Sequence, residues 1–385
     1  MRILLQANAP WQGTGYGGPA RKLARYLRED GHEVAMLAND IRTGAAVNMD
    51  DMVIYPMYHD PFAADVVEAH CDHWRAKLLI TLHDIWPYPT NYREVVGFKD
   101  GRLWLGWFPL DHEPPSVDLL RVARTLDIAC VFSRFGWEKL REAGLPCRYL
   151  PLAYDPAVFR PGDKAKAREA LGLPREAFIC AIVAANMEYP SRKAFPEQLA
   201  AFKVFRDRHK EAFLYLHTNL DPEPTFIVKA IDFSRLIPLL GLPEGSWVAV
   251  NQYHRLLGLS EQRMALVYQA SDVLLSASMA EGFGLPIVEA QACGTPVITN
   301  RSTSMPELTH NGLCVEPVQR WFAPQGWWQL PSVEGIAEAL ERIYSGPEGF
   351  RRDEGLKAVA EYAWPHVYRT YWRPLLAELE GGHVH

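Results

Sequence analysis

The sequence predicts an α/β protein built from two doubly wound, Rossmann-like domains. Short apolar runs alternate with helical patterns through most of the chain, which is the pattern of βαβ units and parallel sheets. This alternation occurs twice, on either side of a proline-punctuated stretch at 150–163 that has no clear period. A length of 385 residues exceeds one ordinary core and suits two domains.

The first series predicts six strands, each a short apolar run. They are expected at 2–8, 33–38, 52–57, 78–83, 127–132 and 147–151. Between the first two, residues 19–27 carry apolar side chains at helical spacing. Pro19 stands at the start of this stretch, where a helix tolerates it.

The second series predicts five more strands with helices between them, followed by a helical ending rich in Tyr and Trp. The strands are expected at 178–185, 212–217, 247–251, 272–277 and 296–299. We therefore expect an N-terminal domain of residues 1–155 plus 362–385 and a C-terminal domain of residues 156–361. Ligands of open α/β sheets bind at the carboxyl ends of the strands, so function should lie between the domains.

Composition and charge exclude several classes of protein. A net charge of −6 without a long run of one sign argues against nucleic acid as a partner. No stretch approaches 18 apolar residues and the N-terminus does not resemble a signal peptide, so we expect at most peripheral membrane contact. Six scattered cysteines indicate reduced thiols in the cytoplasm.

A glycine-rich motif, Gly13-Thr14-Gly15-Tyr16-Gly17-Gly18, follows the first expected strand and precedes a helix. It fits GxGxxG, and Asp40 follows the second strand, as in a dinucleotide-binding fingerprint. However, residues 9–12 separate the strand from the first glycine, where that fingerprint needs a tight turn. Two alternatives remain open: a loop whose amides face a phosphate or sugar at the helix N-terminus, and a flexible loop that needs positive φ.

A second motif runs from Glu281 to Glu289 after the expected strand at 272–277. Pro286 stands where a first helical turn would begin, and a helix from there directs its N–H groups and positive dipole end toward a ligand. Gly282 and Gly284 allow a ligand close to the backbone. The two carboxylates suit paired sugar hydroxyls, although both could also be ordinary helix-end residues.

This motif, with Ser271–Ser276 before it and Ala290–Ile298 after it, resembles glycosyltransferase family 4. That family contains retaining enzymes with the GT-B fold. Residues 151–161 are similar to its hinge, which normally reads Pro-Asn-Gly-Val-Asp and ends in Phe-Arg-Pro. The aromatic final helix is similar to the family's crossover, in which the chain returns to the N-terminal domain.

The resemblance implies roles for individual residues. Glu289 would hold the ribose hydroxyls, Glu281 would lie by the donor sugar, and His83 looks like the family's cleft histidine. The catalytic set it implies is His83, Lys193 and Glu281. The donor-binding set is Gly17, Gly18, Arg192, Lys193, Phe283, Gly284, Leu285 and Glu289. No protein nucleophile is assigned.

The chain departs from the family pattern at one cation. The family carries an Arg shortly after the first C-terminal strand and a Lys further on, and both neutralise the leaving diphosphate. Lys193 matches the Lys, but Asn186 or Met187 stands at the Arg position. Either Arg192 substitutes or one charge is absent, and Arg192 and Lys193 could also be a solvated pair.

We expect a hexose to pass from a UDP- or GDP-sugar to a hydroxyl acceptor that is a glycan, a lipid-linked group or a small molecule. The nucleobase is expected near Asn251 and Tyr253, which follow a C-terminal strand. No metal and no cofactor beyond the donor is expected, because cations would stabilise the diphosphate and no DxD pair is positioned for a metal. The alternatives are a non-catalytic GT-B binding subunit, a nucleotide-sugar epimerase, and an NAD enzyme suggested by the N-terminal glycines.

Overall fold

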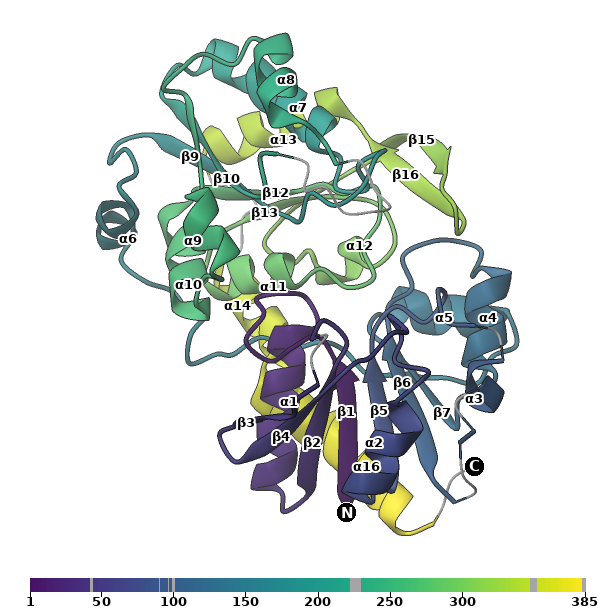
Figure 1. Ribbon diagram of the computed structural model, residues 1–385. Coiled ribbons are helices and arrows are strands. Elements are labelled where there is room, and N and C mark those ends of the chain that lie inside the picture. Colours follow the sequence, from purple (N-terminus) through teal and green to yellow (C-terminus); the bar gives the residue numbers. More distant parts are fainter. Residues whose placement is uncertain are drawn as a thin grey trace. The chain divides into compact units, whose positions relative to one another are not determined.

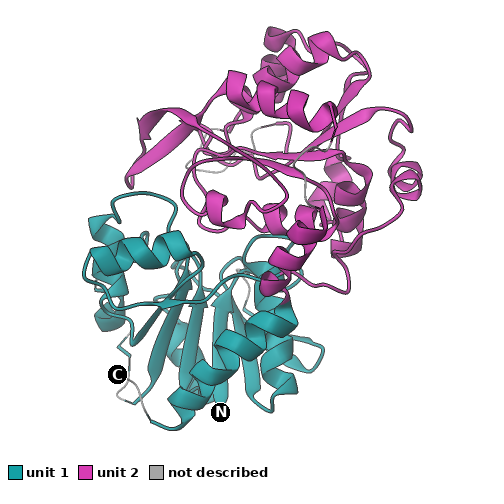
Figure 2. Cartoon of the chain, turned by 180° about the vertical axis from the view of Figure 1, so that it is seen from behind, with its two compact units in different colours: residues 1–153, 364–385 teal, residues 154–363 magenta. Residues whose placement is uncertain are grey.

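The computed structural model describes all residues except 42–43, 90, 96, 99–100, 222–229, 347–351 and 383–385. The chain forms two compact units (Figure 2). The first contains Met1–Ala153 and Trp364–His385, and the second contains Tyr154–Ala363. The C-terminal segment therefore belongs to the same unit as the N-terminus.

The first unit contains an eight-stranded sheet in the order β3-β4-β2-β1-β5-β6-β7-β8 (Figure 1). Its strands are β1 (Arg2–Ala7), β2 (Glu33–Ala38), β3 (Val47–Met49), β4 (Met52–Pro56), β5 (Leu78–Leu82), β6 (Leu103–Phe108), β7 (Ile128–Val131) and β8 (Arg148–Tyr149). Every neighbouring pair is parallel except β3 and β4, which form an antiparallel hairpin at the edge.

Helices of the first unit bury one face each. They are α1 (Gly17–Glu29), α2 (Val67–Trp74), α3 (Tyr92–Val95), α4 (Val117–Ala123), α5 (Arg134–Glu142), α15 (Trp364–Val367), a π-helix (Tyr368–Trp372) and α16 (Arg373–Glu380). In α1 the buried positions include Ala20, Leu23 and Leu27, which confirms the helical spacing read from the sequence. The C-terminal segment is built into this unit, since the buried Trp372 meets the Trp107 ring edge-on at 4.9 Å.

The second unit contains a six-stranded, wholly parallel sheet in the order β11-β10-β9-β12-β13-β14. Its strands are β9 (Phe178–Val183), β10 (Ala212–His217), β11 (Trp247–Ala249), β12 (Val273–Ser276), β13 (Val297–Asn300) and β14 (Gly312–Val315). A separate antiparallel hairpin follows, formed by β15 (Pro317–Phe322) and β16 (Trp327–Pro331). Both strands of this hairpin are visible in Figure 1.

The helices of the second unit connect these strands. They are α6 (Lys164–Leu171), α7 (Phe195–Arg208), α8 (Phe233–Leu240), α9 (Gln252–Leu256), α10 (Glu261–Ala270), α11 (Leu285–Ala292), α12 (Met305–Leu308), α13 (Val333–Tyr344), α14 (Arg352–Val359) and a 3₁₀ turn (Ala360–Tyr362). A core of buried aliphatic and phenylalanine side chains from β9, β10, β12, α7 and α13 holds this unit together.

Every strand expected from the sequence is present, to within about two residues at each end. Strands β3, β6, β14 and the β15–β16 hairpin were not expected. Strand β6 lies inside the sheet, where its run Leu-Trp-Leu-Gly-Trp-Phe is buried on both faces and shows no alternation. Gly106 leaves room for Leu126, because a Cβ there would lie 2.5 Å from a Leu126 methyl carbon and would force that side chain to shift.

Each sheet has one point at which the strand order reverses direction. In the first unit this point lies between β1 and β5, and in the second it lies between β9 and β12. The loops that leave two adjacent strands at such a point run in opposite directions and open a crevice at the carboxyl edge of the sheet. The residues after β1, β5, β9 and β12 are therefore where ligands are expected. None of the helices in the described part of the chain is long and apolar enough to cross a membrane.

Candidate active site

The clearest polar cluster of the second unit lies at its reversal point. Lys193 comes from the loop after β9, and Glu281 comes from the loop after β12. The Lys193 ammonium donates to both carboxylate oxygens of Glu281, at 2.7 and 2.8 Å, and the Ser278 hydroxyl donates to Oε1 at 2.6 Å. Glu281 is buried. The topology thus brings together two charged residues that are 88 positions apart in sequence.

Arg192 adds a second cation to this cluster. Its Nη1 lies 3.4 Å from Glu281 Oε2 and donates to the Ala280 carbonyl at 2.8 Å, while its Nε donates to Glu188 at 3.2 Å. Burial opposes ionisation of Glu281, but the charges of Lys193 and Arg192 prevail and hold the pKa of this carboxyl below its usual value. Desolvation lowers the pKa of the Lys193 ammonium, and Glu281 counteracts that effect.

Asn186 has a structural task, although the family carries a cation at or beside its position. Its side-chain amide donates to the carbonyls of Asn219 and Ile231, at 3.1 and 2.7 Å, and its Oδ1 accepts from the Ile231 N–H at 2.9 Å. The residue is 2% exposed. Its neighbour Met187 is 66% exposed. Among the described residues, Arg192 is therefore the arginine after β9 that reaches the cluster.

Helix α11 begins where the sequence predicted, with Pro286 in its first turn. Gly284 precedes the helix with φ 114°, a backbone conformation that favours glycine. The Phe283 ring is buried and meets the Tyr362 ring edge-on at 5.5 Å, so it serves packing. In the first turn of α11 Pro286 has no N–H and the Ile287 N–H donates to the Gly284 carbonyl at 2.9 Å, so this segment can offer a ligand chiefly the positive end of the helix dipole.

Glu289 lies on α11 with a different partner from Glu281. Tyr268 of α10 donates its hydroxyl to Glu289 Oε2 at 2.8 Å. Burial raises the pKa of Glu289 to about 7, partly offset by this hydrogen bond, and the charge of Glu261 acts in the same direction as burial. The two motif glutamates are thus in opposite electrostatic states, one held ionised by cations and one close to half-protonated at neutral pH.

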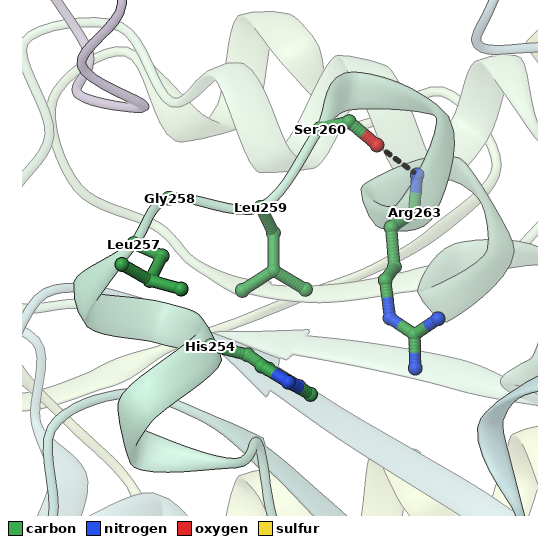
Figure 3. Close-up of a pocket in the computed structure, with 6 residues that line it drawn as sticks. All are labelled: His254, Leu257, Gly258, Leu259, Ser260 and Arg263. Atoms are coloured by element: carbon green, nitrogen blue, oxygen red, sulfur yellow. Dashed lines mark hydrogen bonds between the residues drawn. The ribbon is translucent and has the colours of Figure 1, made fainter.

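A hollow of about 290 Å³ lies between α9 and α10 of the same unit. Figure 3 shows its lining, with the side chains of His254 and Arg263 extending toward the same space. The complete lining is His254, Leu257, Gly258, Leu259, Ser260 and Arg263. Ser260 caps α10 by accepting from the Arg263 N–H.

The expected nucleobase residues lie beside this hollow without lining it. Asn251 caps α9 by accepting from the His254 N–H at 2.9 Å, and Tyr253 is 65% exposed. Sequence reasoning missed His254 and Arg263. The signal available was that both follow β11 within the segment in which the nucleobase was already expected.

The first unit carries the remaining predicted residues at its own reversal point, between β1 and β5. A Cβ on Gly17 would lie 2.6 Å from the Gln12 carbonyl and 2.7 Å from that of Ala9, so this glycine is required by backbone packing. A Cβ on Gly18 would meet nothing within 4 Å, so there is free space beside this residue, although its N–H already donates to the Thr14 carbonyl at 3.4 Å. The loop therefore contains one glycine needed for its shape and one beside free space.

His83 follows β5, and its ring lies 5.1 Å from that of Tyr16. Tyr16 in turn donates its hydroxyl to Asp84 at 2.7 Å. Burial lowers the pKa of His83 to about 4, so the imidazole is neutral near pH 7. Its Nε2 atom is buried and has no hydrogen-bond partner among the described residues.

In a dinucleotide-binding fingerprint Asp40 would bind the ribose, but in this structure it is hydrogen-bonded to the glycine-rich loop. Asp40 accepts from the Ala9 N–H at 2.8 Å and from the Asn8 side chain at 3.2 Å, so it holds the loop in place. The loop also runs from Ala7 to Gly17, too long for the tight turn of that fingerprint. Among the described residues, no group of three or more His, Cys, Asp or Glu side chains is placed to hold a metal ion.

Residues 250–357 match the family described as glycosyl transferases group 1. This stretch of the second unit therefore resembles glycosyl transferases group 1. The matched range includes Glu281, Glu289 and the hollow between α9 and α10, whereas Arg192 and Lys193 lie before it.

Curated relatives match the chain over part of its length. It is 29% identical over 223 residues to the MMP alpha-(1->4)-mannosyltransferase of Mycolicibacterium hassiacum, which covers 57% of this chain and 45% of the relative. It is 31% identical over 216 residues to the D-inositol 3-phosphate glycosyltransferase of Saccharomonospora viridis, covering 56% and 44%. The matches span less than half the length of these relatives.

Solved structures resemble the chain along nearly its whole length. Sucrose-phosphate synthase from Thermosynechococcus elongatus superposes with a TM-score of 0.74 at 20% identity, covering 98% of this chain and 99% of that one. Anabaena HepE in complex with UDP and glucose gives a TM-score of 0.70 at 15% identity, covering 98% and 100%. At these identities the likeness shows the fold, which is the GT-B fold of two Rossmann-like units.

Proposed function

We propose that this protein is a retaining glycosyltransferase of family 4 that transfers a hexose from a UDP- or GDP-sugar to a hydroxyl acceptor. The observation that carries the proposal is the Lys193–Glu281 pair, held at the reversal point of a sheet beside the N-terminus of α11. A cation, a carboxylate and a helix N-terminus at one edge suit a ligand that has both phosphates and hydroxyls.

In this proposal the second unit stabilises the leaving diphosphate. The bond between sugar and diphosphate breaks while negative charge grows on the phosphate oxygens. Lys193 and Arg192 supply positive charge, and the N–H groups at the start of α11 supply fixed dipoles. Glu281 keeps the Lys193 ammonium protonated and oriented despite its burial, because its charge opposes the desolvation of Lys193.

The nucleoside half of the donor is assigned to α9, α10 and α11. Glu289 accepts the ribose hydroxyls when it is ionised. The base is assigned to the hollow beside Asn251 and Tyr253, where His254 and Arg263 can donate hydrogen bonds. HepE was solved with UDP-glucose, and that is the precedent for testing a UDP-sugar first.

The first unit is assigned to the acceptor. The neutral His83 imidazole and the free space beside Gly18 are its candidate contacts to sugar or phosphate. We propose that the acceptor is a glycan, a lipid-linked group or a small molecule, that any membrane contact is peripheral, and that nucleic acid is no partner. We further propose a metal-independent reaction and a cytoplasmic location, in which the six free thiols would stay reduced.

A nucleotide-sugar panel tests the proposal. UDP-, GDP- and ADP-sugars are screened by thermal shift, because a ligand that binds the native state raises its melting temperature. The stabilising donor is then followed for nucleotide release with and without EDTA, in the wild type and in Lys193→Ala and Glu289→Ala. Lys203→Ala on α7 is the matched control, since Lys203 pairs with Asp207 instead of Glu281. Unchanged rates in the first two variants would refute the site assignment.

A second candidate is a non-catalytic GT-B subunit that binds a donor or a partner. The observation that favours it is Asn186, whose side chain is fully committed to main-chain bonds where the family places a cation. Donor binding without turnover, in the presence of a broad acceptor panel, would support this alternative. An epimerase would instead convert the donor sugar or release nucleotide without any acceptor.

A further inference from the structure

Two non-glycine residues with left-handed backbone lie beside the Lys193–Glu281 pair. In the described part of the second unit, positive φ at a non-glycine residue occurs at Ala194, with φ 49°, and at Thr303, with φ 48°. This conformation is unfavourable for L-residues and especially for a β-branched residue such as threonine. Ala194 directly follows Lys193, and Thr303 contacts Glu281. Such strain persists only where the surrounding structure enforces it.

Thr303 holds the main chain of Glu281. Its Oγ1 accepts from the Glu281 N–H at 2.8 Å, and the hydroxyl of the next residue, Ser304, donates to the Glu281 carbonyl at 2.9 Å. Two consecutive hydroxyls therefore fix the peptide groups on both sides of the Glu281 α-carbon. The left-handed conformation of Thr303 sets the direction in which its hydroxyl leaves the chain.

The β15–β16 hairpin supports the same loop through another set of contacts. The indole of Trp328 is buried in a small cluster with Ala194, Met279 and Ala280. The Gln329 N–H donates to the Met279 carbonyl at 3.1 Å. The residue after Lys193 and the residue before Glu281 thus pack in one cluster, so both partners of the ion pair have fixed backbones.

We propose that Thr303 is a positioning residue of this site. Its hydroxyl fixes the main chain at Glu281 and thereby aims the carboxylate at the Lys193 ammonium. A correctly placed Glu281 in turn keeps that ammonium protonated where charge develops on the leaving diphosphate. The inference rests on the proposed glycosyl transfer and adds a residue that acts through Glu281.

Replacing Thr303 with glycine distinguishes an effect on the position of Glu281 from an effect on the stability of the fold. Thr303→Gly adopts positive φ without strain but lacks the hydroxyl, whereas Thr303→Ser keeps the hydroxyl. We expect Thr303→Gly to leave the melting temperature unchanged or raised and to lower kcat for donor turnover about tenfold, as expected for the loss of one hydrogen bond that orients a charged group. Its affinity for the nucleoside diphosphate alone should stay at the wild-type value, and Thr303→Ser should restore kcat.

Asp51→Gly is the matched control, since Asp51 has φ 57° and lies exposed in the β3–β4 turn of the first unit. It should leave kcat unchanged. Wild-type kcat in Thr303→Gly would overturn the inference, as would a loss of kcat that parallels a fall in melting temperature across Thr303→Gly and Thr303→Ala. The proposed function fails differently, because the wild type itself would then neither bind nor turn over any nucleotide sugar.

Discussion

Replacing Glu289 with glutamine should remove a pH-dependent destabilisation of the native state. Burial of this carboxyl raises its pKa to about 7, from an ordinary value of 4.5. Because the native-state pKa is the higher one, the folded protein binds the proton more tightly than the unfolded chain does. The contribution of Glu289 to the free energy of unfolding is therefore fully present below about pH 4.5 and is lost as pH rises through about 7.

The size of the effect follows from the shift. A difference of about 2.5 pH units, at about 1.4 kcal/mol per unit, sets an upper bound of roughly 3 kcal/mol on the free energy of unfolding. Glutamine does not ionise in this range. The free energy of unfolding of Glu289→Gln, relative to that of the wild type, should therefore increase by on the order of 1–3 kcal/mol between pH 5 and pH 8. Tyr268→Phe should raise the pKa of Glu289, because the Tyr268 hydrogen bond favours the ionised carboxylate. The loss of stability should then occur at a higher pH.

Urea unfolding from pH 4.5 to 8.5 measures this difference. Glu338→Gln is the control, since it removes an exposed glutamate of α13 from the same unit. Binding of the nucleoside diphosphate should respond with the opposite sign, becoming tighter as pH rises through about 7 and Glu289 ionises to accept hydroxyls. Parallel pH profiles of stability for the wild type and Glu289→Gln would refute the reasoning.

Four further changes test the cationic cluster. Lys193→Met leaves Glu281 buried beside one remaining cation, so chemical denaturation should show a loss of about 3–5 kcal/mol, and the double variant with Glu281→Gln should recover part of it. Arg192→Ala should weaken nucleoside diphosphate binding about 10- to 100-fold in calorimetry, the loss expected of one charge-assisted bond to phosphate; equal affinity would exclude Arg192 from the site. Glu188→Gln should tighten the same binding by up to about fivefold, because it removes a partly exposed competitor for Arg192. Asn186→Arg should lower the melting temperature without restoring a phosphate contact, because it removes three main-chain hydrogen bonds; a stable variant with tighter binding would contradict this.

Local pattern was sufficient for most of the fold. Each parallel strand that was expected is a short apolar run bounded by turn residues, and that signal does not depend on the strand's neighbours. Strand β6 carries the same signal, an apolar run between Gly101 and Pro109, but a continuous run with two tryptophans is equally compatible with a buried helix. The β15–β16 hairpin was missed for another reason: its outer face carries exposed side chains such as Phe322, so its sequence has no regular apolar face.

The sequence was sufficient to identify candidate residues of the site, but it did not predict which of them contact one another. Spacing alone placed Glu281 before a helix N-terminus and Lys193 after a strand, and both positions agree with the structure. Their pairing depends on the order β9-β12 within the sheet, which is a tertiary property. The support from Thr303 was also invisible, because positive φ at threonine contradicts local preference and is imposed by the surrounding fold.

The charge balance of the cluster bears on how a diphosphate could be held. The contacts of the described residues set two cations, Arg192 and Lys193, against two carboxylates, Glu188 and Glu281. A diphosphate would therefore meet a group of nearly zero net charge and must take a cation from a carboxylate. The Lys193–Glu281 contact is short and buried, whereas Glu188 is 35% exposed and can turn to solvent at little cost. If the chain binds a diphosphate as proposed, Arg192 would be the cation that changes partner, and it would then supply the charge that the Asn186 side chain lacks.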